Sequence, residues 1–93
     1  MKLLIKVFAN FREICGGKTV TLTIEDGQPI YSVLNQLIDR FPLMAEELFI
    51  EPKKLKPLVH VFINGKNIIH LEGLTTPVKE TDQIALFPPV AGG

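Results

Sequence analysis

Cysteine, tryptophan and net charge are what this sequence lacks most clearly. Cys15 is its one cysteine, and tryptophan is absent among 93 residues. A single cysteine forms no internal disulfide, which suits a reducing compartment. Ten basic residues balance ten acidic ones, so no net field attracts nucleic acid or an anionic membrane. Both kinds of partner are therefore disfavoured.

Long hydrophobic runs are missing as well. The first seven residues resemble the start of a signal peptide, but Lys6 interrupts them and no small-residue cleavage site follows. No segment approaches the ~20 apolar residues of a membrane span, and no glycine-rich loop predicts binding of ATP. With 46% hydrophobic residues, the chain has the composition and length of one globular domain with a modest core. We expect a soluble protein of the cytoplasm.

The hydrophobic pattern predicts five β-strands, at residues 2–9, 19–24, 59–63, 67–69 and 83–87. A glycine pair between the first two strands predicts a hairpin. An Asn-Gly pair between the third and fourth strands is a strong signal for a second tight turn.

The spacing of the apolar residues changes between the second and third predicted strands. Over residues 29–41 the apolar side chains recur at intervals of three and four, which predicts an amphipathic helix that starts at one proline and stops before another. Residues 44–49 predict a second, short helical piece. The stretch from there to residue 58, and residues 71–83, are interpreted as loops.

One main helix and a mixed sheet make an α+β arrangement. The order strand, strand, helix, strand, short strand, strand predicts a ubiquitin-like β-grasp, with a sheet of four to five strands and the helix packed on one face. In that fold the first and last strands lie side by side and parallel at the centre. We expect residues 1–87 to form this domain and residues 88–93 to form an extended tail.

Alternation assigns every strand residue to one face of the sheet. The inward set is apolar and consists of Leu3, Ile5, Val7, Val20, Leu22, Ile24, Val59, Val61, Ile63, Ile84 and Leu86. The outward set consists of Leu4, Phe8, His60, Phe62, Ala85 and Phe87, with only threonines from the second strand. Its three phenylalanines predict an exposed apolar patch, which is typical of a protein–protein surface. The less favoured alternative is a patch covered by the loop at 42–58 or 70–82.

The chain closes with the residues Phe87-Pro88-Pro89-Val90-Ala91-Gly92-Gly93. Two prolines stiffen the exit from the last strand, and two glycines leave no side chain to obstruct a narrow channel. Extended, the six residues beyond Phe87 reach at most ~20 Å. We therefore predict that the α-carboxylate of Gly93 is the reactive group and that the folded domain holds and presents it.

Other chemistry-bearing residues are few. His60 and His70 lie on separate elements without the ligand spacing of a zinc site, so we interpret them as ordinary surface or interface histidines. Cys15 is expected to be accessible beside its glycines, yet nothing in the sequence activates it as a thiolate. Arg12 and Glu13 are either a docking pair or solvated charges.

Several segments together carry a resemblance to a known family; they are Lys6–Ala9, Phe11–Glu13, Arg40–Pro42, Val61–Gly65, Leu71–Leu74, Thr76–Lys79, Asp82, Ile84 and Phe87–Gly93. The chain resembles the small, sulfur-carrying subunit of molybdopterin synthase, a relative of the thiazole-pathway sulfur carrier and of ubiquitin. The Leu-Glu-Gly-Leu loop and the terminal heptapeptide are the specific motifs, because a diglycine alone is shared by every ubiquitin relative.

The resemblance implies a cycle of sulfur transfer. An adenylating enzyme of the ubiquitin-activating type uses ATP and magnesium to activate Gly93, and sulfur from a persulfide donor then replaces AMP to leave a thiocarboxylate. The large catalytic subunit of the synthase takes the tail into its pocket, where the sulfur passes to a pterin precursor of the molybdenum or tungsten cofactor. This chain is expected to bind no cofactor or metal, and to act as a sulfur-donating subunit without catalysis of its own.

The resemblance also implies which residues meet these partners. Phe8, Arg12 and Phe87 match positions that contact partners in the family. The full expected partner-binding set is Phe8, Arg12, Phe62, Phe87, Pro88, Pro89, Val90 and Ala91, with Gly92 and Gly93 as the reactive end.

Three other functions stay open. A ubiquitin-like modifier would be joined through Gly93 to lysines of other proteins, and small archaeal-type relatives of the family resemble carrier and modifier at once. The thiazole carriers tend to be shorter and lack both the stretch at 42–58 and the Phe-Pro-Pro-Val tail. A plain interaction domain would keep its function without Gly93.

Overall fold

The computed structural model describes residues 1–89, and its main feature is a five-stranded mixed sheet. The strands are β1 (Lys2–Val7), β2 (Thr19–Thr23), β5 (His60–Ile63), β6 (Lys66–Asn67) and β7 (Ile84–Phe87). Their order across the sheet is β2-β1-β7-β5-β6, and β1 runs parallel to β7 while the other pairs are antiparallel. The predicted β-grasp, with the first and last strands together at the centre, is confirmed.

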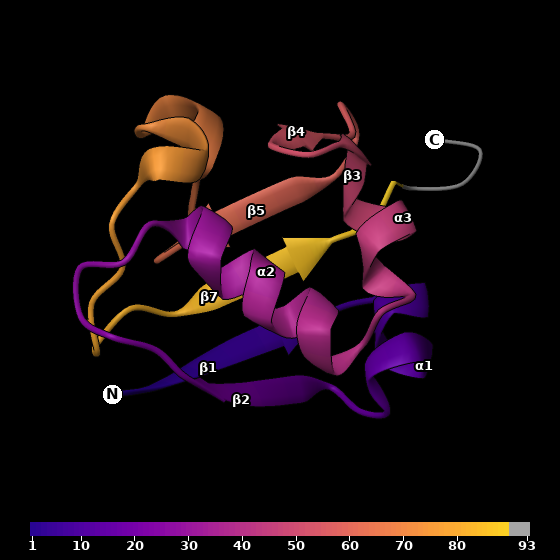
Figure 1. Ribbon diagram of the computed structural model, residues 1–93, viewed down its shortest axis with the longest axis horizontal. Helices are drawn as coiled ribbons and strands as arrows, with labels where there is room; N and C mark the ends of the chain where they lie inside the picture. The colour runs from indigo at the N-terminus through magenta and orange to yellow at the C-terminus, as the bar shows by residue number, and fades with distance from the viewer. Residues whose placement is uncertain (90–93) are drawn as a thin grey trace.

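The main helix α2 (Ile30–Arg40) lies across one face of this sheet (Figure 1). It buries its apolar stripe completely at Val33, Leu34 and Leu37. The helix follows Pro29, whose fixed φ of −68° suits a helix entry, and it ends two residues before a second proline. The predicted amphipathic helix is therefore confirmed to within a residue at each end.

The hydrophobic core lies between the sheet and α2. All eleven residues predicted to face inward are buried, none with more than 6% of its surface exposed. The threonines of β2 all point to the other face and are exposed, as expected. Burial of one face of each strand is what fixes the register, since a slip by one residue would turn every one of these side chains to solvent.

A short helix that the sequence did not reveal follows β1. The prediction that the first strand runs to residue 9 is wrong, because β1 ends at Val7 and α1 (Asn10–Cys15) begins three residues later. Phe11 and Cys15, four residues apart, are the side chains that α1 buries. The helix has no side-chain cap at its start and is only six residues long, so it left no recognisable signal.

The stretch predicted as a loop after α3 (Met44–Leu48) is a small hairpin. Its strands are β3 (Phe49–Glu51) and β4 (Lys54–Leu55), and they form a separate two-stranded sheet. The turn between them holds Pro52 and Lys53, the latter at a positive φ of 64°. The predicted short helix at 44–49 is confirmed, whereas strands of three and two residues are too short to show alternation.

The predicted return strand at 67–69 is also corrected. Only Lys66–Asn67 pairs as β6, and the chain then turns into a short 3₁₀ helix, η1 (Ile68–His70). The Asn67 side chain accepts a hydrogen bond from the backbone N–H of Ile69 and so caps this turn at 3.1 Å. A second 3₁₀ turn, η2 (Gly73–Thr75), lies in the predicted loop. No helix in residues 1–89 has the length and apolarity to cross a membrane.

Candidate functional site

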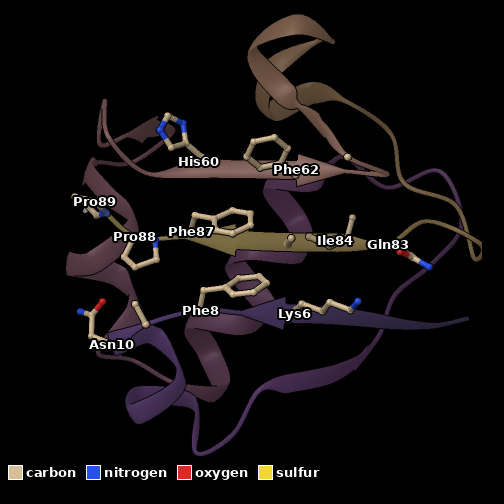
Figure 2. A pocket seen from close by; sticks show the side chains of 13 residues that line it. Lys6, Phe8, Asn10, His60, Phe62, Gln83, Ile84, Phe87, Pro88 and Pro89 are labelled. Atoms are coloured by element: carbon tan, nitrogen blue, oxygen red, sulfur yellow. The ribbon is translucent and has the colours of Figure 1, made fainter. Parts of the chain in front are cut away.

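An aromatic groove runs across the sheet face opposite α2. Phe8 directly follows β1, Phe87 ends β7 and Phe62 lies on β5, so the three rings come from neighbouring strands (Figure 2). Phe8 and Phe87 stack with ring centroids 4.3 Å apart, and Phe62 meets the edge of Phe87 at 5.3 Å. Each ring is half-buried, because it packs against its neighbour. The remaining exposed half of each ring contributes to a continuous apolar surface on this face.

The groove has a volume of about 1050 Å³. It is lined by Lys6, Phe8, Ala9, Asn10, His60, Phe62, Gly65, Gln83, Ile84, Ala85, Phe87, Pro88 and Pro89. No residue of 42–58 or 70–82 lines it, so the alternative in which one of those loops covers the phenylalanines is wrong. Among residues 1–89 this large apolar hollow is open to a partner.

Arg12 is tied to the edge of the groove by two contacts. Its Nε donates a hydrogen bond to the carbonyl of Val7 at 2.9 Å, and its guanidinium carbon lies 5.0 Å from the centre of the Phe8 ring. The first contact holds α1 against the end of β1, and the second is a cation–π interaction. Arg12 therefore has a structural role that the sequence did not indicate. Glu13, its supposed companion, is exposed and makes no salt bridge within residues 1–89.

The exit of the chain from β7 is anchored at its first residue. Pro88 is buried, whereas Pro89 is exposed, and both line the groove beside Asn10. A buried proline with a fixed φ restricts the direction in which the chain leaves the sheet. The predicted site residues Val90, Ala91, Gly92 and Gly93 lie outside the described residues.

His60 and His70 lie on different elements, β5 and η1. His60 is exposed at the rim of the groove, where its Nδ1 is 3.1 Å from the side-chain nitrogen of Asn67. Within the described part of the chain, no three side chains of histidine, cysteine, aspartate or glutamate gather into a possible metal site.

The expectation that Cys15 is accessible is wrong. It is the last residue of α1 and is only 8% exposed, because the helix turns its side chain into the core. Burial also raises the pKa of the Cys15 thiol, since the charged thiolate loses its hydration there. A buried thiol with a raised pKa is a poor nucleophile and a poor carrier of sulfur.

The fold and the groove define a class: this is a ubiquitin-like β-grasp protein with an open aromatic sheet face. The model of the ThiS family matches residues 5–93, and the chain belongs to that family. It is 38% identical to small archaeal modifier protein 3 of Haloferax volcanii over the whole of both chains. It is 28% identical to the sulfur carrier protein CysO of Mycobacterium tuberculosis, over 84% of this chain and 83% of that protein.

A solved structure adds a relative with a bound partner. In the crystal structure of the Amycolatopsis orientalis BexX/CysO complex, one chain matches 98% of this protein and is itself covered to 99%. The two are 25% identical and superpose with a TM-score of 0.80. The small β-grasp proteins similar to this chain thus include modifiers, sulfur carriers and a member solved in a complex.

Proposed function

We propose that this protein is a sulfur carrier for the synthesis of the molybdenum or tungsten cofactor, with Gly93 as the carrying residue. The observation that carries the proposal is the aromatic groove and its continuity with Pro88 and Pro89. A partner that docks on the groove lies beside the point where the chain leaves the sheet. Its active site then needs to reach only the few residues beyond Pro89.

The chemistry proposed for Gly93 has three steps. Its carboxylate attacks the α-phosphorus of ATP on an adenylating enzyme, and pyrophosphate leaves. The terminal sulfur of a cysteine persulfide then displaces AMP and forms an acyl disulfide. A second thiol attacks the donor cysteine's sulfur in that bond, so a disulfide forms between the two thiols and the thiocarboxylate leaves. A carboxylate is a poor electrophile until such a leaving group is attached, which is why the activating partner with its ATP and magnesium is required. The carrier itself contributes recognition and positioning.

The buried state of Cys15 supports a carrier that loads sulfur on its C-terminus. A carrier of the cysteine type needs an exposed thiol of low pKa, and this chain's thiol is buried with a raised pKa. We propose that the adenylating enzyme and the large subunit of molybdopterin synthase use the same face in turn. Phe8, Phe62, Phe87 and Arg12 would then contact both partners, and Val90, Ala91 and Gly92 would thread the narrow channel.

The test is mass spectrometry of the protein after incubation with ATP, magnesium, a persulfide donor and the adenylating enzyme. Exchange of one oxygen for sulfur adds about 16 Da, and fragmentation must place it on Gly93, because oxidation of methionine adds nearly the same mass. A variant without Gly93 is the control. We expect it to keep its fold and to gain no sulfur; normal cofactor synthesis by that variant would rule out the proposal.

A second candidate function is favoured by a separate observation. The 38% identity to small archaeal modifier protein 3, over the full length of both chains, supports a role as a protein modifier. The same acyl adenylate would be attacked by a lysine amine in place of sulfur, with loss of AMP and formation of an amide. Glycine remnants on lysines of other proteins, together with an unsulfurated chain end, would favour this function over the carrier.

A further inference from the structure

His60 lies on the rim of the aromatic groove, next to two of its three phenylalanines. It begins β5, pairs across the sheet with Phe87 and meets Phe62 edge-on, with ring centroids 6.4 Å apart. Its side chain is exposed, and Figure 2 shows the ring at the Pro89 end of the groove, above Phe87. A group placed there meets any partner that docks on the three phenylalanines.

The neighbouring Asn67 determines which nitrogen of His60 carries the proton. The Asn67 Oδ1 accepts the backbone N–H of Ile69 at 3.1 Å, which fixes the orientation of the amide. Its nitrogen is therefore directed at the Nδ1 of His60, also at 3.1 Å. An amide nitrogen only donates, so Nδ1 must accept, and the proton of a neutral imidazole is on Nε2.

The Nε2–H of His60 is left without a hydrogen-bond partner within residues 1–89. The opposite side of the groove carries Lys6, the one charged side chain among the residues that line it. Among the described residues that line the groove, none is a carboxylate. Lys6 and His60 therefore offer donors on opposite sides of an apolar floor, while the amides of Asn10 and Gln83, which also line the groove, can donate or accept. The surface that complements Lys6 and His60 is apolar with an oxygen acceptor at each of these two points.

We infer that His60, held by Asn67 with its proton on Nε2, is a specificity-determining donor that selects a docking protein with a carboxylate or carbonyl oxygen facing it. The inference rests on the proposed function, because the docking protein is taken to be the adenylating enzyme. Asn67 is a positioning residue that acts through His60. A partner with an N–H group at this point would face donor against donor and would be rejected.

The tautomer is tested on the free protein, without any partner. Two-bond ¹H–¹⁵N spectra at about pH 8.5, where an ordinary imidazole is neutral, should show the His60 proton on Nε2. In Asn67→Asp a carboxylate oxygen still accepts from Ile69 while the other accepts from the imidazole, so the proton should move to Nδ1. A wild-type proton on Nδ1, or a tautomer that Asn67→Asp leaves unchanged, would overturn the assignment.

The selection is tested by the Kd for the adenylating enzyme. His60→Leu should weaken binding about five- to tenfold, as expected for one lost interface hydrogen bond, and Asn67→Asp should weaken it to a similar extent. His60→Gln, whose amide N–H₂ can replace Nε2–H, should stay within about twofold of the wild type. Thr23→Ala, on the far edge strand, is the matched surface control.

Each outcome has its own meaning. If His60→Leu binds the adenylating enzyme as tightly as the wild type does, the proposed role of His60 in partner selection is overturned. The proposed function is then left intact. If the wild-type protein does not bind an adenylating enzyme at all, the proposed function and the selection both fail. The tautomer assignment would still be decided by the spectra alone.

Discussion

The rings of Phe8 and Phe87 lie almost parallel, at 9°, with their centroids 4.3 Å apart. Phe8 follows the first strand and Phe87 ends the last strand, so the stack joins the carboxyl ends of the two parallel strands at the centre of the sheet. The guanidinium of Arg12 lies on Phe8, and Phe62 meets the edge of Phe87. The aromatic floor of the groove is therefore a coupled set of side chains, and changes within it should not act independently.

A double-mutant cycle on Phe8→Ala and Phe87→Ala tests that coupling. We expect the free energy of unfolding to show an interaction of about 0.5–1.5 kcal/mol between the two sites, because a stacked pair gains more than the area it buries. Urea unfolding of the wild type, both single variants and the double variant gives the value. Additive effects would mean that the stack contributes nothing to stability.

Phe62→Ser should impair docking and leave the fold intact. Phe62 is half-buried and presents its ring to the groove, so its loss should weaken binding to the adenylating enzyme at least tenfold, as for an aromatic hot spot. The matched control is Leu4→Ser, since Leu4 is 45% exposed on the same face but does not line the groove. Titration calorimetry measures the binding to the adenylating enzyme, and circular dichroism checks that the fold is retained. An equal loss of affinity in both variants would show that general surface hydrophobicity, and not the groove, drives binding.

Ala9→Gly should stabilise the protein. Ala9 has φ 52° and ψ −133°, a conformation that costs a residue with a Cβ about 1–3 kcal/mol. Glycine adopts it freely but loses about 0.5–1 kcal/mol of chain entropy on folding. The net gain in unfolding free energy should be about 1 kcal/mol, measured by urea denaturation.

The opposite change, Gly65→Ala, is the control for that prediction. Gly65 has φ 82° and no atom lies within 4 Å of an added Cβ, so the cost is one of backbone conformation alone. We expect a loss of about 1–2 kcal/mol. If Ala9→Gly instead destabilises the protein by the usual entropic cost of glycine, the strain at the β1–α1 junction is absent in solution.

Ionisation of Cys15 should destabilise the fold in alkaline solution. Because burial raises the pKa of this thiol, the folded protein keeps the proton over a pH range in which the unfolded chain has lost it. The unfolded state then binds fewer protons, so stability is full below the unfolded value of about 8.5 and falls as the pH rises above it. The difference between wild type and Cys15→Ala in urea midpoints, from about pH 7 to pH 10, isolates this contribution; a constant difference would contradict it.

Local periodicity was enough to predict most of the fold. Strand alternation and the helical stripe place the eleven inward residues and α2 correctly, since both patterns reflect which side chains must leave water. The elements that were missed are short: α1 has six residues and β4 only two. Elements of that length are stabilised by their contacts with the rest of the protein and carry little periodic signal.

The sequence by itself determined the sheet faces, and hence that Phe8, Phe62 and Phe87 point away from the helix, because a side chain's face follows from its position along the strand. It also supplied the glycines that make Gly93 the proposed reactive end. Only the tertiary structure decided that neither residues 42–58 nor residues 70–82 cover these rings. It alone placed Cys15 in the core and directed the Asn67 amide at His60. These facts depend on contacts between distant segments, and no local pattern encodes the distance between two side chains that meet only after folding.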